Sequence, residues 1–66
     1  MNVNVNGDDR EVPAGLDVGA LLERLELLPE LVVVEKNGEI VRRGDYAGTP
    51  VEEGDRFELV HFVGGG

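Results

Sequence analysis

Two Asn-Gly pairs, Asn6-Gly7 and Asn37-Gly38, limit the folds open to this chain more than any other feature. Type I′ turns require positive φ at both central residues, which asparagine and glycine tolerate, so each pair predicts a tight turn between antiparallel strands. The first turn joins the alternating segment 2–6, whose valines share one face, to a short strand at residues 10–13. A proline ends that second strand and cannot donate to a sheet, which suits a position at the sheet edge.

The second hairpin pairs residues 31–34 with residues 39–42. Residues 31–34 are apolar at every position, which is typical of a strand that is covered on both faces or lies centrally in a sheet. Residues 43–56 are rich in glycine and charge, and we expect Tyr46 and Val51 to anchor this segment to the core.

One segment between the hairpins has the periodicity of a helix. Asp17 is placed to cap its first turn, because the carboxylate can accept from the free backbone N–H groups there. Pro29 is expected to end the helix, since the residue before a proline avoids helical dihedrals, which predicts a helix of about 10–12 residues. Its apolar stripe comprises Val18, Leu21, Leu22, Leu25 and Leu28.

A final turn is marked by Gly54-Asp55, and the last strand is predicted at residues 56–63 with Phe57 and Leu59 facing the helix. The order of elements is then strand, strand, helix, strand, strand, strand. We therefore predict an α+β fold of the β-grasp type, with about four to five strands in a mixed sheet and one main helix packed across it. The last strand would lie in the middle, parallel to the first, and residues 1–63 would form this single domain.

The opposite face of the last strand carries Glu58, Val60 and Phe62. Large apolar side chains on an outward face predict an exposed patch, and such patches commonly mark contact surfaces. The alternative is that residues 43–51 cover Val60 and Phe62.

The chain ends in Gly64, Gly65 and Gly66, which we expect to form a flexible tail. Glycine loses more conformational freedom on folding than any other residue, so such a run does not add stability. A backbone without Cβ atoms can, however, enter a narrow slot in another protein and present its carboxylate there. A leftover linker is the alternative, but the direct run from the last strand into the glycines favours a native terminus.

Charge and length exclude several classes of function. The chain of 66 residues has 14 acidic and 6 basic side chains and a net charge of −8, which repels nucleic acids and anionic membranes and attracts a basic protein surface. No apolar run reaches the roughly 18 residues of a membrane span, and no signal peptide opens the chain, so we expect a cytoplasmic protein. Because cysteine is absent, no side-chain thiol can form a disulfide or carry sulfur.

No set of side chains forms a recognisable catalytic or metal site. Thr49 and Tyr46 supply the only side-chain hydroxyl groups and His61 the only imidazole, without the spacing of a nucleophilic triad. The acidic pairs Asp8-Asp9 and Glu52-Glu53 are expected in turns, too few in oxygen ligands for calcium. We therefore expect no catalytic residue, no metal and no cofactor, and we expect His61 to be partly buried or at an edge.

The segments Val32–Asn37, Gly54-Asp55 and Phe57–Gly66, together with Tyr46, form a pattern that extends over nearly the whole chain. This pattern resembles the ThiS family, the ubiquitin-like sulfur carriers of thiamine biosynthesis. A diglycine end alone is common to ubiquitin-like carriers, whereas Val-His-Phe-Val before the glycines in so short a chain is more specific.

The resemblance implies that the protein is a substrate of other proteins rather than an enzyme. In the family, an adenylyltransferase related to ubiquitin-activating enzymes uses MgATP to adenylate the terminal carboxylate, here that of Gly66. A persulfide sulfur, supplied ultimately by a cysteine desulfurase, then leads to a thiocarboxylate, from which thiazole synthase takes the sulfur. By the same resemblance Gly64 and Gly65 thread the partners' channels, Val60 and Phe62 dock, and ATP binds to the partner.

Three other functions remain open at this point. One is a sister carrier with the same tail chemistry, for molybdopterin synthesis or tRNA thiolation. The second is a ubiquitin-like modifier that becomes conjugated to lysines, and the third is a β-grasp interaction module with an inert tail.

Overall fold

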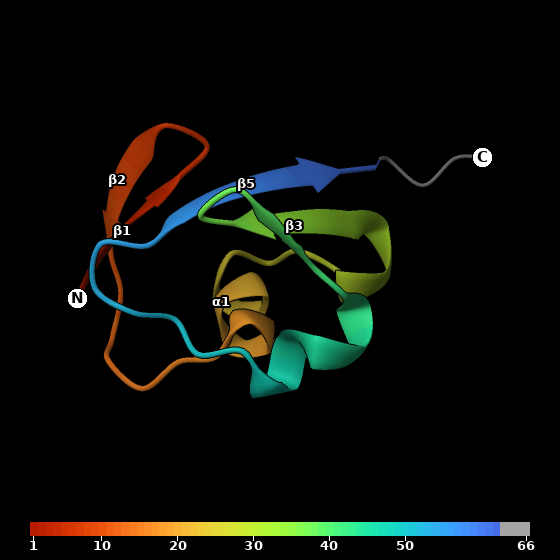
Figure 1. Cartoon of the computed structure of the whole chain (residues 1–66), viewed down its shortest axis with the longest axis horizontal. Coiled ribbons are helices and arrows are strands. Elements are labelled where there is room, and N and C mark those ends of the chain that lie inside the picture. The colour runs from red at the N-terminus through yellow and green to blue at the C-terminus, as the bar shows by residue number, and fades with distance from the viewer. Residues whose placement is uncertain (63–66) are drawn as a thin grey trace.

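The computed structural model of the protein describes residues 1–62, which form a five-stranded mixed sheet in the order β2-β1-β5-β3-β4 (Figure 1). The central strand β5 is parallel to β1 and antiparallel to β3. The β-grasp prediction is therefore confirmed, including the place and direction of the last strand. The strands are β1 (Asn2–Val5), β2 (Asp8–Glu11), β3 (Val32–Lys36), β4 (Glu39–Val41) and β5 (Arg56–His61). The expected tail, residues 64–66, lies outside the described residues, as does residue 63.

Both Asn-Gly hairpins have the predicted turn geometry. The φ angles are +51° and +90° at Asn6 and Gly7, and +51° and +87° at Asn37 and Gly38. Strand β2, however, begins two residues earlier than predicted, because the two-residue turn places Asp8 directly opposite the last residue of β1.

The main helix α1 (Val18–Arg24) is shorter than predicted and does not extend to Pro29. Its N-cap is Asp17, as expected, with the carboxylate accepting from the Ala20 N–H at 2.7 Å. The helix ends instead where Glu26 adopts a left-handed φ of +59°. The Glu26 N–H then donates to the Glu23 carbonyl at 3.0 Å and the Leu27 N–H to the Leu22 carbonyl at 2.9 Å, which is a Schellman motif.

This early helix end changes the role of the residues that follow. Leu28, predicted as part of the apolar stripe, is 57% exposed. Pro29 begins a short 3-10 helix, η1 (Pro29–Leu31), where its fixed φ is favourable and its missing N–H costs nothing.

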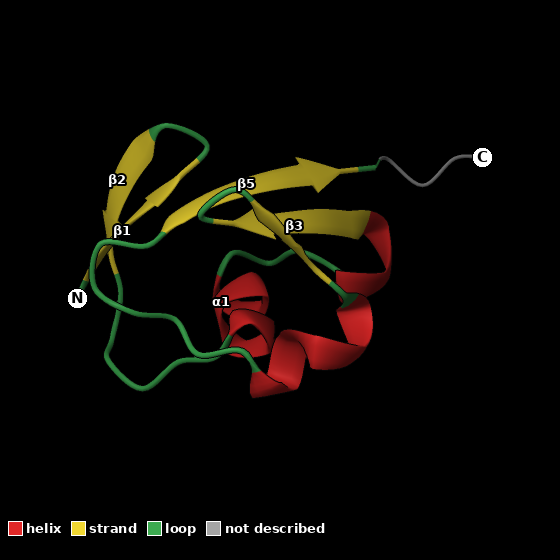
Figure 2. Cartoon of the chain, in the orientation of Figure 1, coloured by secondary structure: helices red, strands yellow, loops and turns green. Residues whose placement is uncertain are grey.

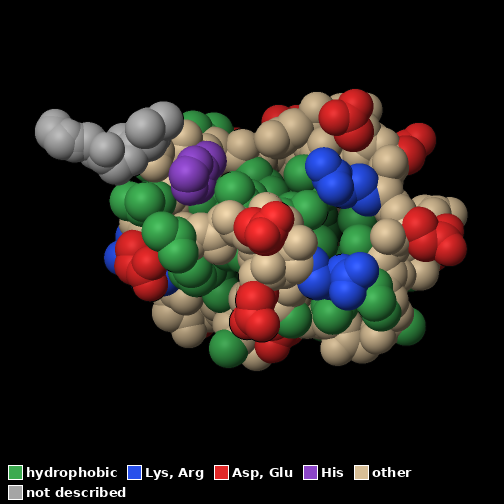
Figure 3. All heavy atoms as spheres, turned by 180° about the vertical axis from the view of Figure 1, so that it is seen from behind, with side chains coloured by type: hydrophobic (Ala, Val, Ile, Leu, Met, Phe, Trp, Pro, Cys, Tyr) green, Lys and Arg blue, Asp and Glu red, His purple; other side chains and the backbone are tan. Residues whose placement is uncertain are grey.

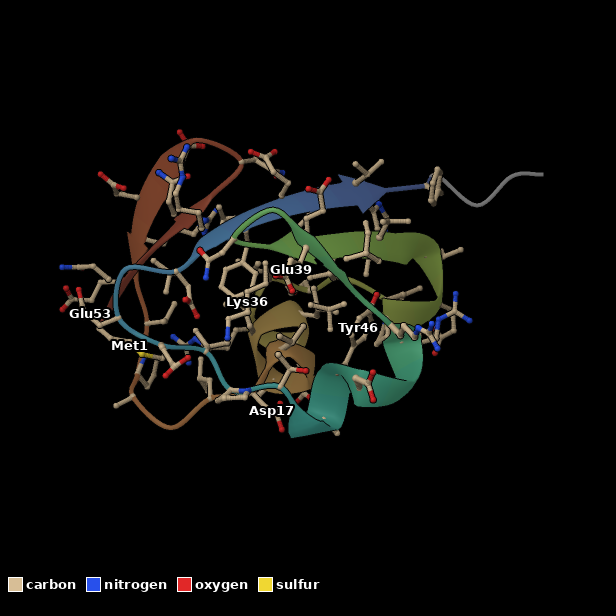
Figure 4. All side chains as sticks on the ribbon, viewed as in Figure 1. Met1, Asp17, Lys36, Glu39, Tyr46 and Glu53 are labelled. Carbon is tan, nitrogen blue, oxygen red and sulfur yellow. The ribbon has the colours of Figure 1, made fainter. Side chains whose placement is uncertain are left out.

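The helices of the described residues lie on one side of the sheet (Figure 2). The buried core draws side chains from both of these layers. The second 3-10 helix, η2 (Arg43–Gly48), contributes Tyr46, whose side chain points towards β3 and donates its hydroxyl to the Val32 carbonyl at 3.0 Å (Figure 4). Tyr46 and Val51 are both buried, as predicted. The buried core residues are Val3, Val5, Val12, Val18, Leu21, Leu22, Val32, Val34, Tyr46, Val51, Phe57 and Leu59.

The other face of the sheet, called here the outer face, is not covered by any described element. Strand β3 is an interior strand with neighbours on both sides, but Val33 on its outer face is 39% exposed. Of the two alternatives for residues 31–34, a central place in the sheet is therefore confirmed, and cover on both faces is wrong. None of the helices in residues 1–62 combines the length and apolarity needed to cross a membrane.

Candidate functional site

Strand β5 separates the core from the outer face by strict alternation. Phe57 and Leu59 are buried against the helical layer, whereas Val60 and Phe62 are each 55% exposed. The alternative that residues 43–51 cover Val60 and Phe62 is wrong, because that segment packs on the helical side through Tyr46.

The neighbouring strands extend this apolar surface. Val33 lies directly opposite Val60, and Ile40 lies opposite Glu35 on the same face. The Phe62 N–H donates to the Leu31 carbonyl at 2.7 Å, so the chain follows β3 for one residue beyond β5. We call the four exposed side chains that share this area the outer-face patch, and they are Val33, Ile40, Val60 and Phe62.

Two of these four residues, Val33 and Ile40, were not predicted as site residues. The apolar run in residues 31–34 concealed the outward position of Val33, because every residue in it reads as core. The turn at Asn37-Gly38 sets the register that places Ile40 opposite Glu35 of β3, on the outer face.

Asn6 anchors β5 at the point where the first hairpin turns away from it. Its side-chain amide accepts from the Leu59 N–H at 2.7 Å and donates to the Leu59 carbonyl at 3.1 Å. The amide thus takes the place of a peptide group on a neighbouring strand, and it hydrogen-bonds both backbone groups of Leu59 where β1 no longer pairs with β5. Strand β5 then continues beyond the first hairpin towards the C-terminal end of the chain (Figure 1).

The start of β5 is held by a second polar network around Asp55. One oxygen of this buried carboxylate accepts from the Asn37 side chain at 2.9 Å, and the other accepts from the Glu52 N–H at 2.7 Å. The Lys36 ammonium lies 3.5 Å from the same carboxylate, with its side chain directed at the loop before β5 (Figure 4). The Arg56 N–H donates to the Asn37 side-chain oxygen at 2.9 Å. Side-chain amides therefore hold the last strand at two points, Asn37 at Arg56 and Asn6 at Leu59.

His61 is exposed, so the alternative of partial burial is wrong. The alternative of an edge position is confirmed, because β1 pairs with β5 only at Arg56 and Phe57 and His61 therefore has a strand neighbour, β3, on one side only. By alternation along β5, His61 is on the same face of the sheet as Phe57 and Leu59. There it lines an open hollow together with Arg10 and Arg24. In the rear view of Figure 3, apolar surface lies between basic side chains and the imidazole. Thr49 does not line this hollow, and its hydroxyl donates to the Asp45 carbonyl at 2.7 Å. The described residues thus bring no threonine to the histidine.

The acidic pairs serve local structure. Asp8 and Asp9 lie in β2 rather than in a turn, and Asp9 accepts from the Asn4 side chain at 3.0 Å. Glu53 accepts from the Asn2 N–H at 2.9 Å. Within residues 1–62, no three histidine, aspartate or glutamate side chains gather in a way that could hold a metal ion. The predicted tail residues Gly64–Gly66 lie outside the described residues.

Comparison with known proteins decides the family. A family model described as the ThiS family matches residues 3–66. The chain belongs to the ThiS family. Over 46 residues this ThiS-family chain is 41% identical to the sulfur carrier protein ThiS of Bacillus subtilis, a match that covers 70% of each chain. The family resemblance seen in the sequence is thereby confirmed.

Two further matches concern the fold and the length. A crystal structure of the thiamine biosynthesis protein ThiS from Geobacter metallireducens superposes with a TM-score of 0.84 at 40% identity, covering 100% of both chains. A thiazole synthase of Magnetococcus marinus is 41% identical over 66 residues, and the ThiS-family chain spans only 20% of its length.

Proposed function

We propose that this ThiS-family chain is a sulfur carrier protein of thiamine biosynthesis and not itself an enzyme. The carrier would be adenylated at the carboxylate of Gly66 and converted there to a thiocarboxylate, which supplies sulfur for thiazole formation. The observation that carries the proposal is the family match, because it runs through the glycines to residue 66. The Bacillus subtilis relative is named a sulfur carrier, and the Magnetococcus marinus relative is named a thiazole synthase.

The chemistry explains why such a chain needs partners. A carboxylate is a poor acyl donor, because its oxygen is a poor leaving group. Attack of the Gly66 carboxylate on MgATP would release pyrophosphate and form an acyl adenylate. A persulfide sulfur would then displace AMP and form an acyl disulfide with the partner's cysteine. A second thiol would attack that cysteine sulfur, form a disulfide with it and release the thiocarboxylate. The chain has no cysteine, so the sulfur must come from another protein, ultimately a cysteine desulfurase.

The fold suits a carrier that two partners must recognise in turn. Val60 and Phe62 would dock on the adenylyltransferase and then on thiazole synthase, because both side chains are exposed immediately before the glycines. Gly64 and Gly65 would thread the partners' channels. MgATP would bind to the adenylyltransferase, so the carrier would need no cofactor of its own, and we place these steps in the cytoplasm.

Intact-mass spectrometry of the protein from its native host, grown without thiamine, tests this function. We expect a mass increase that corresponds to replacement of one oxygen by sulfur, located at Gly66 by fragmentation. The same spectrum tells whether Gly66 ends the chain or whether the carrier is part of a longer polypeptide, as the match to 20% of a thiazole synthase makes worth checking.

A matched pair of variants tests the role of the glycines. Gly65→Ala is expected to abolish adenylation by the host's adenylyltransferase, because a Cβ would enter a slot shaped for bare backbone. Gly48→Ala is the control, since a Cβ at Gly48 meets nothing within 4 Å. Isopeptide adducts in a host lysate would instead indicate a modifier, and a chain left unchanged by adenylyltransferase and MgATP would indicate an inert interaction module.

A further inference from the structure

Two glutamates stand side by side on the outer face, next to the outer-face patch. Glu35 of β3 lies directly opposite Glu58 of β5, and Ile40 of β4 lies opposite Glu35 on its other side. Val33 and Val60, the next residues on the same face, also lie directly opposite each other. Two carboxylates are therefore surrounded on two sides by exposed apolar side chains.

The pair has no stabilising role that the described residues reveal. Like charges directly opposite each other on neighbouring strands are destabilising. Within residues 1–62, neither carboxylate forms an ion pair or a side-chain hydrogen bond, since both ion pairs of this part of the chain belong to Lys36. Lys36 points to the other face, where it bonds to the Pro50 carbonyl at 2.8 Å. Arg56 lines a shallow hollow with Glu35 and Glu58 but makes no ion pair with either of them.

The charges on this face indicate what covers it. An apolar surface that covered the patch without a cation would strip water from two adjacent carboxylates, at a high cost in free energy. A guanidinium placed between them could donate to both, because its planar fork matches carboxylate geometry. The net charge of −8 would also attract a partner whose docking surface is basic.

We propose that the outer-face patch, together with Glu35 and Glu58, docks on an apolar surface of the adenylyltransferase that presents an arginine side chain to the two carboxylates. This rests on the proposed function and adds the chemistry of the contact. Val33, Ile40, Val60 and Phe62 supply the apolar contact area. The glutamate pair sets the register of the complex, because only one placement of the partner brings its arginine between the two carboxylates.

Steady-state adenylation kinetics with the host's adenylyltransferase and MgATP test the proposal. The double variant Glu35→Gln/Glu58→Gln is expected to raise KM for the carrier at least about tenfold with little change in kcat, because the partner's cation loses both acceptors. The control Glu23→Gln/Glu39→Gln removes the same charge from α1 and β4, away from the outer-face patch, and is expected to leave KM nearly unchanged.

Two outcomes overturn the proposal. An equal change in KM for the two double variants would show that only net charge matters, and a lowered Tm of the Glu35→Gln/Glu58→Gln variant would show that the pair serves stability. The expected result is an unchanged or raised Tm, because like-charge repulsion is removed. If the unsubstituted protein itself is not adenylated, the proposed function fails, and the docking proposal fails with it because it names that partner.

Discussion

Replacing Glu26 by glycine should stabilise the protein. Glu26 is the one residue among the described positions, other than asparagine and glycine, that has a positive φ. The left-handed conformation costs a residue with a Cβ about 1–2 kcal/mol, because the Cβ crowds the following carbonyl oxygen. Glycine avoids this cost but loses about 0.5–1 kcal/mol more in chain entropy on folding. From the middle of these two ranges, the net gain in the free energy of unfolding is about 0.75 kcal/mol, which in a domain of this size raises Tm by about 3–6 °C.

Urea and thermal unfolding followed by circular dichroism measure this gain, and two controls isolate its cause. Glu26→Ala removes the same carboxylate but keeps a Cβ in the left-handed conformation, so the free energy of unfolding should change by less than about 0.5 kcal/mol. Glu23→Gly places glycine inside α1 and should destabilise the protein by about 0.5–1 kcal/mol. If Glu26→Gly destabilises the protein, or if Glu26→Ala stabilises it equally, then the left-handed conformation of Glu26 is not a source of strain.

Four further substitutions test other parts of the structure. Tyr46→Phe should lower the free energy of unfolding by about 1–3 kcal/mol in urea titrations, because the buried Val32 carbonyl loses its partner. Asp17→Ala should lower it by about 1 kcal/mol, since the cap of α1 is lost; an unchanged urea midpoint would contradict this. Phe62→Ala should change the free energy of unfolding by less than about 0.5 kcal/mol but raise KM for adenylation, because Phe62 is exposed. Phe57→Ala in the core should lower the free energy of unfolding by about 3–5 kcal/mol. Equal destabilisation by the two phenylalanine variants would show that Phe62 is part of the core.

Features that depend on neighbouring residues could be predicted from the sequence. The two Asn-Gly turns have the predicted geometry, because positive φ at both positions is a property of those residues themselves. The N-cap at Asp17 and the buried side of β5 were predicted for the same kind of reason, since capping and alternation act over a few residues. The central place of the last strand, parallel to the first, was also predicted, because one helix between two hairpins leaves few topologies.

The length of α1 and the composition of the outer face depended on contacts between distant segments. The periodicity of residues 18–28 predicted a longer helix, but the Schellman motif ends it at Arg24 and leaves Leu28 exposed. No local signal required a left-handed glutamate there. The left-handed turn at Glu26 instead brings Leu27 against the core, a contact with distant segments that the helical spacing did not predict.

The pairing of Glu35 with Glu58 combines one feature that the sequence predicts with one that only the tertiary structure decides. Alternation along β5 predicted the outward position of Glu58, and the family resemblance in the sequence extended through the last strand to Gly66. Which residue stands opposite Glu58, however, depends on the register between β3 and β5, which are separated by β4 and η2 along the chain. A shift of one residue would turn every side chain of β3 to the other face, so the buried positions of Val32 and Val34 exclude that shift, and the pairing observed in the tertiary structure brings the two carboxylates together.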